Sequence, residues 1–286
     1  MEVRKVNGFF IIFVIGYIGL SVVCASIMAY AQNSGIAVPD WIQYVMSEGI
    51  MLLIAIIYMI VQKIDPIREI PYKRIGIVDV ILSLVAGYCL IPAVLLISNL
   101  SMLFSTNYLE EGTTTLLTYP FAMQVILLAV IPPLVEELIF RGIFFGSYRK
   151  AGMTGAALMS GLLFGCFHLN INQALYAFVT GIVFAYMVEA TGSLWSSVIA
   201  QNTYSIGIVQ ILKMAGIYAQ DGSVSETFEN AESVAGQSTA VTVVQIAMIA
   251  VIAAVFMMLA VLCIRTMAKR HGNLEKMKIQ KVKLSH

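Results

Sequence analysis

Residues 121–145 read FAMQVILLAVIPPLVEELIFRGIFF, an apolar run that is long enough to cross a bilayer as a helix. Three ionisable residues interrupt it: Glu136, Glu137 and Arg141. A charge within a membrane span costs several kcal/mol on most scales, so such residues usually have a paired or functional reason to be there. This run therefore predicts both a membrane protein and a polar site within its core.

The composition of the whole chain agrees with this prediction. Of 286 residues, 59% are hydrophobic and 12% are charged, and the mean hydropathy is +0.88. A soluble domain needs more polar surface to cover its core. The net charge of +1 gives no indication of a nucleic-acid partner. The four cysteines lie in apolar runs without a Cys-x-x-Cys spacing, so they predict neither disulfides nor a cysteine-based zinc site.

The apolar runs predict an all-α, polytopic bundle of about eight transmembrane helices. Both termini are then on the same side of the membrane. The expected spans are Phe9–Ala29, Tyr44–Val61, Ile77–Ser98, Phe121–Phe145, Thr154–Leu169, Ala174–Val188, Leu194–Ile217 and Val241–Ile264. The fifth and sixth are short, which leaves a tilted or partly re-entrant arrangement open for them.

The loop charges predict the orientation. Lys and Arg occur near the N-terminus, in two alternate loops and in the C-terminal tail, whereas the other loops carry only acidic residues. Because basic residues gather on the cytoplasmic side, both termini are expected to be cytoplasmic. The expected divisions are residues 1–120 with the first three spans, 121–217 with a catalytic core of four spans, and 218–286 with an outer loop, the last span and a basic tail. This tail is expected to contact lipid.

The two adjacent glutamates of the fourth span differ in whether they have a cation within reach on the same helix. Glu137 and Arg141 are four residues apart and can pair on one helix face. That pair alone could simply lock helices together, but such a lock does not explain Glu136. Pro132 and Pro133 are expected to loosen the helix just before Glu136 and to free backbone carbonyls. By contrast, Glu48 and Asp79 are expected to reach the membrane interface.

Polar residues of two further spans are expected at a similar depth. Counted from the predicted inner ends at 1.5 Å per residue, Glu136 lies about 21 Å up its helix and His168 about 26 Å up the next. Gln201 and Asn202 lie about 14 Å up the seventh span by the same rise. Within tilt and kink, these side chains converge past the middle of the membrane. A proton path, an ion site and a hydrolytic site would all need such convergence.

Three motifs, taken in order, resemble those of the CPBP intramembrane proteases, the family of type II CAAX prenyl endopeptidases and of bacteriocin-processing and immunity proteins. Glu136-Glu137-x-x-x-Arg141 resembles the family's EExxxR motif, and Phe164-x-x-x-His168 resembles FxxxH. The stretch Phe178–Trp195, ending Thr-Gly-Ser-Leu-Trp, is similar to the run into the third motif. The resemblance covers about residues 127–205. It implies a membrane protease with Glu136, Glu137, Arg141, His168 and the third motif at its site.

The third motif departs from the family pattern. Where the family has HxxxN, Gln201 takes the place of His and Ser205 that of Asn, while Asn202 lies one residue after Gln201. Zinc favours His and carboxylate ligands, so the change weakens a zinc mechanism, in which His168 would be the candidate ligand. A Gln amide can still donate a hydrogen bond to a developing oxyanion. The departure thus affects a glutamate-and-water mechanism less.

The leading functional hypothesis is hydrolysis of a peptide bond in a membrane-embedded or membrane-associated substrate, prenylated, CAAX-like or bacteriocin-type. Glu136 would activate water, Glu137 and Arg141 would hold the geometry, His168 would orient water, transfer a proton or bind a metal, and Gln201 with Asn202 would stabilise the oxyanion. The expected location is a bacterial cytoplasmic membrane. Two alternatives stay open: an inactive scaffold or immunity protein, and a transporter, although no inverted repeat is evident.

Overall fold

The computed structural model describes residues 3–102, 118–214 and 239–277, and all regular structure in these ranges is helical. The longest helices are α1 (Val3–Asn33), α2 (Trp41–Val61), α4 (Ile77–Ser101), α9 (Met153–Phe167), α10 (Ile171–Thr191), α11 (Leu194–Met214) and α13 (Thr239–Arg270). The helical stretch from Phe121 to Ala151 consists of α6 (Phe121–Gln124), η1 (Val125–Val130), α7 (Ile131–Glu137), η2 (Leu138–Phe145), α8 (Gly146–Tyr148) and η3 (Arg149–Ala151). Two further short helices are α3 (Pro66–Glu69) and α14 (Leu274–Met277). The all-α prediction is confirmed.

Each of the eight predicted spans falls on a helix, with ends that differ by a few residues. Residues 215–217 of the seventh span lie outside the described residues. Six helices in the described residues are long and apolar enough to cross a membrane, namely all but α9 and α11 among the predicted spans. The protein is thus an integral membrane protein. α9 is short, at 15 residues, and α11 is the more polar one. Eight crossings therefore remain a prediction.

The polarity of α11 follows from its position in the bundle. It packs against α4, α10, α7 and η1. Its Ser196, Ser197, Gln201 and Thr203 side chains are all buried. A helix surrounded by protein can carry polar groups that a lipid-facing helix cannot, because its neighbours provide hydrogen-bond partners.

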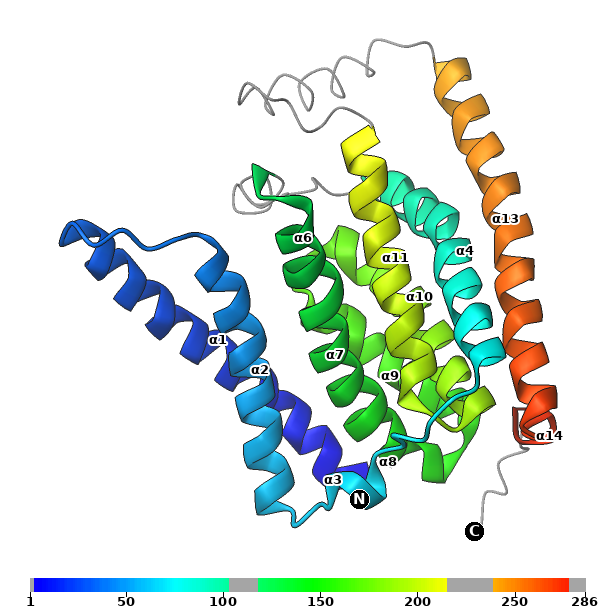
Figure 1. The fold of residues 1–286 in the computed structure, drawn as a ribbon, viewed down its shortest axis with the longest axis horizontal. Coiled ribbons are helices and arrows are strands. Elements are labelled where there is room, and N and C mark those ends of the chain that lie inside the picture. The colour runs from blue at the N-terminus through cyan, green and yellow to red at the C-terminus, as the bar shows by residue number, and fades with distance from the viewer. Residues whose placement is uncertain (1–2, 103–117, 215–238, 278–286) are drawn as a thin grey trace.

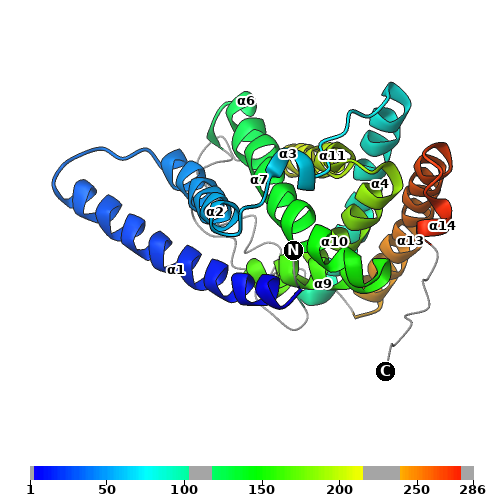
Figure 2. The same ribbon diagram turned by 90° about the horizontal axis from the view of Figure 1, so that it is seen from below.

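The outer helices bound the bundle on two sides. The α1–α2 hairpin lies at one side and α4 with α13 at the other, and α7, α9, α10 and α11 lie between them (Figures 1 and 2). In α1 and α13 few residues of the apolar stretch are buried within the protein, 6% and 17% respectively. Their exposed apolar side chains are those that a bilayer would cover.

The start of α1, α3, α8 and α14 all lie at one end of the bundle (Figure 1). This places at one end the described basic segments that the sequence assigns to the cytoplasmic side. A cytoplasmic position for both termini remains a prediction, because residues 1–2 and 278–286 lie outside the described residues.

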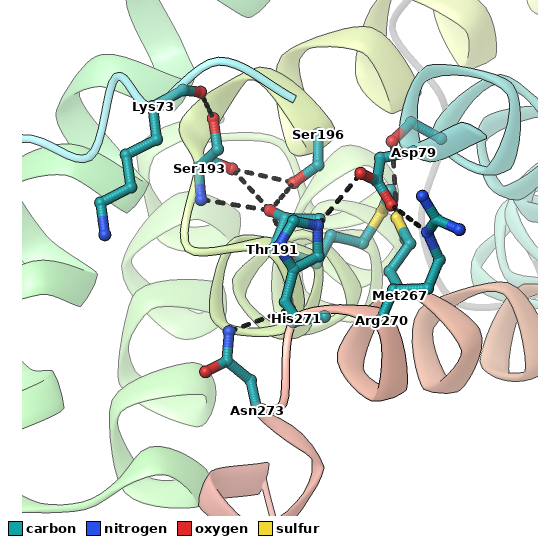
Figure 3. Close-up of polar contacts among 12 residues, drawn as sticks. Lys73, Asp79, Thr191, Ser193, Ser196, Met267, Arg270, His271 and Asn273 are labelled. Carbon is teal, nitrogen blue, oxygen red and sulfur yellow. Dashed lines mark hydrogen bonds and ion pairs between the residues drawn. The ribbon is translucent and has the colours of Figure 1, made fainter. Parts of the chain in front are cut away.

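A polar network holds the helices together at this end (Figure 3). Gly192 ends α10 in the left-handed region at φ 67°, and Ser193 then donates a hydrogen bond from its hydroxyl to the backbone carbonyl of Lys73. Thr191 bonds to the hydroxyl of Ser196 at 2.9 Å. The Thr-Gly-Ser turn thereby fixes the beginning of α11 against the loop that precedes α4.

Asp79 belongs to the same end, in the first turn of α4. Its side chain is only 2% exposed. Arg270 and His271 at the end of α13 approach it at 3.3 and 3.0 Å (Figure 3). A buried carboxylate is retained because two basic side chains from another helix partner it.

The helix that carries the EExxxR motif is wound as a π-helix on both sides of α7, at Val125–Val130 and Leu138–Phe145. Such wider turns are rare and occur often at functional sites. Pro133 has no N–H to give to the carbonyl of Ala129, four residues earlier. With its amide nitrogen turned toward two carbonyls, Asn202 of α11 donates to this oxygen at 2.9 Å and to Val198 at 3.0 Å. The expected release of a carbonyl by the prolines is thus matched by a partner from another helix.

Candidate functional site

Glu137 and Arg141 form an ion pair inside the bundle. Glu137 Oε1 and Arg141 Nη1 are 2.6 Å apart, and both side chains are fully excluded from the surface. The predicted i, i+4 pairing is therefore present. Beside this pair, the Ser197 side chain of α11 hydrogen-bonds to Glu137. Each charge thus depends on the other, and loss of either would leave an uncompensated buried charge.

The Arg141 guanidinium is enclosed by α9 and α10. It lies 4.4 Å from the ring centroid of Phe164 and 5.3 Å from that of Phe184, which are cation–π distances. Gly181 provides the remaining space, because a Cβ there would come within 2.9 Å of Arg141 Nη2 and of the Gly161 Cα. Gly181, which lies in the stretch Phe178–Trp195 that leads into the third motif, therefore lets α10 approach both α9 and the Arg141 guanidinium.

Glu136 has a different partner from its neighbour. Gln201 of α11 donates a hydrogen bond from Nε2 to Glu136 Oε2, and the Gln201 side chain is only 5% exposed. The other amide oxygen of Gln201 is buried without a hydrogen-bond partner. The predicted approach of the fourth and seventh spans thus brings these two residues together, and Glu136 is not in the ion pair with Arg141.

Three residues that the sequence analysis did not assign to the site lie within range of the charge of Glu136. Glu48 of α2 lies close enough for the two carboxylates to repel one another. The charge of Glu136 also acts on the phenols of Tyr176 in α10 and Tyr204 in α11. Glu48 Oε2 is buried and has no hydrogen-bond partner in the described part of the chain, and the expected interface position of Glu48 stays a prediction. The signal available in the sequence was that Glu48 is the sole charged residue of its span.

His168 lies beside the ion pair rather than in it. Its Nδ1 is 2.8 Å from the carbonyl oxygen of Phe164, and its ring meets the Phe164 ring edge to face at 4.9 Å. Since a carbonyl can only accept, Nδ1 is the donor of this hydrogen bond. In the described part of the chain His168 makes no hydrogen bond or ion pair with either glutamate. Phe164 thereby contacts both Arg141 and His168.

A cavity of about 250 Å³ lies against the EExxxR helix. Leu134, Val135 and Leu138 of the EExxxR helix form one wall. The other lining residues come from α2, the following loop and the first turns of α11: Leu52, Tyr72, Leu194, Trp195 and Val198. Its lining is almost entirely apolar, so it suits an apolar chain or side chain rather than an ion.

The residues at the site do not fit a zinc centre. Among the described residues no three His, Cys, Asp or Glu side chains cluster as metal ligands would. A catalytic zinc site needs three protein ligands, and Gln201 occupies the place at which the family pattern has a His. We therefore derive no step through a metal, and the chemistry below uses the side chains alone.

Comparison with known proteins supports the motif-based resemblance. Residues 118–206 match the family model "Type II CAAX prenyl endopeptidase Rce1-like". The resemblance predicted from the three motifs is confirmed. The matched segment begins just before α6 and ends within α11, and so contains Glu136, Glu137, Arg141, His168 and Gln201.

One curated relative matches this chain over a segment of similar length. The Bacillus subtilis (strain 168) protein named "Putative membrane peptidase YdiL" is 31% identical over 88 residues. The alignment covers 29% of this chain and 36% of that protein. The likeness thus concerns about a third of each chain. No solved structure gives a significant match.

Proposed function

We propose that this protein is an intramembrane endopeptidase that hydrolyses a peptide bond with a water molecule activated by Glu136. The observation that carries the proposal is the separation of the two adjacent glutamates. Glu137 is bound to Arg141 at 2.6 Å, whereas Glu136 receives a single neutral hydrogen bond from Gln201. A carboxylate that is not bound in an ion pair keeps lone pairs with which to accept a proton.

The side chains divide the reaction between them. Glu136 takes a proton from water as the water oxygen adds to the scissile carbonyl, and later gives it to the leaving nitrogen. The Gln201 amide has a second N–H, which can donate to the oxyanion while the first holds Glu136. Nε2 of His168 would orient the water or pass a proton. Glu137 and Arg141 keep the helix in place, and Asn202 acts through the Ala129 carbonyl.

The proposed substrate is a peptide segment that reaches the site from the membrane or its surface. The apolar cavity lined by Leu134, Val135 and Leu138 of the EExxxR helix would hold an apolar side chain or a lipid-modified residue of the substrate. Prenylated CAAX-like peptides and bacteriocin-type peptides both have this character. The proposed location is a bacterial cytoplasmic membrane.

The test is cleavage of a membrane-anchored peptide library by protein reconstituted in liposomes. Glu136→Gln keeps the size of the side chain but cannot accept the proton, so kcat should fall by about 100-fold or more. Glu69→Gln, at an exposed position of α3, is the matched control and should cleave like the native protein. Full activity of Glu136→Gln would overturn the proposal.

A second function is favoured by the altered third motif. Gln201 and Ser205 stand where the family pattern has His and Asn, which would suit a protein that binds a peptide or partner without cutting it. In that case the biological effect would survive Glu136→Ala and Glu137→Ala in a protein that still folds. It would be lost only when the protein is not made.

A further inference from the structure

The cavity against the EExxxR helix has a buried floor and an exposed mouth. Val135, Leu194 and Val198 line it and are only 8%, 2% and 3% exposed, so they form the floor. Tyr72 and Trp195 also line it but are 42% and 39% exposed, so they lie at the mouth. An apolar group that passes the two aromatic rings would therefore be enclosed by aliphatic side chains.

Two hydrogen bonds hold the backbone of Tyr72 against the beginning of α11. The carbonyl of Pro71, just before Tyr72, accepts from the Leu194 N–H at 2.8 Å. The carbonyl of Lys73, just after it, accepts from the Ser193 hydroxyl (Figure 3). The loop that precedes α4 and the first turn of α11 thereby form one wall of the cavity, although this loop lies outside the matched segment.

The two rings at the mouth have polar groups to offer. The ring centroids of Tyr72 and Trp195 are 6.4 Å apart. Within the described part of the chain, neither the Tyr72 hydroxyl nor the Trp195 indole N–H has a hydrogen-bond partner. Both groups can donate to a backbone carbonyl of a peptide whose side chain fills the floor.

One face of α11 leads from the cavity to the proposed base. Leu194, Val198 and Gln201 lie at i, i+4 and i+7 of this helix and so share a face. Gln201 donates to Glu136 across the boundary between α11 and α7 that the cavity also occupies. Gln201 is about 5–10 Å beyond the two leucine and valine positions at 1.5 Å per residue. An extended peptide covers about 3.3 Å per residue, so this span corresponds to about one to three residues.

We propose that Tyr72 is a specificity-determining residue, and that the cavity behind it takes one large apolar side chain, aromatic or branched, located within three residues of the scissile bond. An engineered protein cavity of about 150 Å³ holds a benzene ring. At about 250 Å³ this cavity is large enough for one such side chain. The inference adds a feature of the substrate, and its kinetic part rests on the proposed protease activity.

Paired peptides in liposomes test the selectivity. The two peptides differ only by Phe or Ala at one position, which is scanned over three residues on each side of the cleaved bond. At one of these positions Phe should lower KM by about 10-fold. Tyr72→Ala should raise KM for the Phe peptide toward that of the Ala peptide, whereas Tyr72→Phe keeps the ring and should retain the KM ratio. Tyr30→Ala, 75% exposed on α1, is the control and should also retain it.

Fluorescence tests the cavity without requiring cleavage. The chain has two tryptophans, Trp41 and Trp195, so Trp41→Phe leaves Trp195 as the sole reporter. The probe is N-acetyl-4-bromophenylalanine methylamide, whose bromine quenches tryptophan fluorescence on contact. In protein that also carries Glu136→Gln, and so cannot cleave the probe, Trp195 should be quenched saturably. Trp41 in the matched Trp195→Phe protein should show no saturable quenching.

The outcomes separate this inference from the proposed function. Equal KM values for the two peptides in a native protein that cleaves both, or a KM ratio that survives Tyr72→Ala, would overturn the inference and leave the protease standing. Quenching of Trp195 that does not saturate would do the same. Quenching by dibrominated phosphatidylcholine that the probe cannot displace would show that lipid fills the cavity, and would also sink the inference. Saturable quenching in a protein that cleaves no peptide would instead refute only the protease.

Discussion

Gln201 of α11 and Glu136 of α7 are joined by a hydrogen bond from the Gln201 amide nitrogen to the Glu136 carboxylate. The bond connects the first and third motifs, which are 65 residues apart in the sequence. It also orients the amide without changing the charge of the carboxylate. This arrangement explains how the site can keep its geometry when Gln replaces the His of the family pattern.

The first prediction concerns that bond. Gln201→Met preserves the length of the side chain but removes its N–H groups, and kcat should fall by about 100-fold to 1,000-fold, as for other lost oxyanion donors. Gln201→His restores a ring N–H and should retain most of the activity. The same Met substitution at Gln210, an exposed position on α11, serves as the control. If Gln201→Met cleaved normally, the amide would have no part in the reaction.

The second prediction concerns the buried ion pair. Removing one partner, as in Arg141→Leu, should lower the free energy of unfolding by about 3–5 kcal/mol, because the other charge stays buried alone. The double variant Glu137→Leu with Arg141→Leu should be more stable than either single variant. Thermal inactivation in detergent would measure this order. Equal stability of the single variants and the native protein would mean that the pair is not structural.

The third prediction concerns Gly181. Alanine there would place its Cβ 2.9 Å from Arg141 Nη2 and from the Gly161 Cα. Overpacking of this kind typically costs about 1–3 kcal/mol, and we expect a lower thermal midpoint together with reduced activity. Gly155→Ala on α9 is the matched control, since a Cβ there meets nothing within 4 Å. A tolerated Gly181→Ala would contradict the close approach of α10.

The fourth prediction concerns the apolar cavity. Leu52→Trp should fill the cavity from the α2 side and leaves the sequence of the EExxxR helix unchanged. KM for a peptide substrate should therefore rise while kcat changes little. Leu53→Trp, on the exposed face of the same helix turn, is the control and should leave both constants unchanged. A rise in KM that is the same for both variants would point to a general disturbance of α2.

Much of the membrane architecture was predictable because lipid imposes a strict rule. Each described span must bond its own backbone, so long apolar runs become helices, and their approximate ends follow from length and hydropathy. The pairing of Glu137 with Arg141 was equally local, since residues four apart share a helix face. Even the effect of Pro133 could be foreseen as a freed carbonyl.

Other features depend on which helices become neighbours, and no local pattern states this. The sequence did not state the partners of Asp79, and packing buries it against Arg270 and His271. Asn202 was assigned to the site with Gln201, and only tertiary structure directs its amide to the Ala129 carbonyl.

The sequence alone determined that this protein is a helical membrane protein with an EExxxR motif within its core, because hydrophobic length and i, i+4 spacing are properties of single segments. Tertiary structure decided that Glu136 and Glu137 have separate partners, Gln201 for the first and Arg141 for the second. The physical reason is that a carboxylate's partners are chosen by three-dimensional packing, through contacts between helices that are distant in the chain.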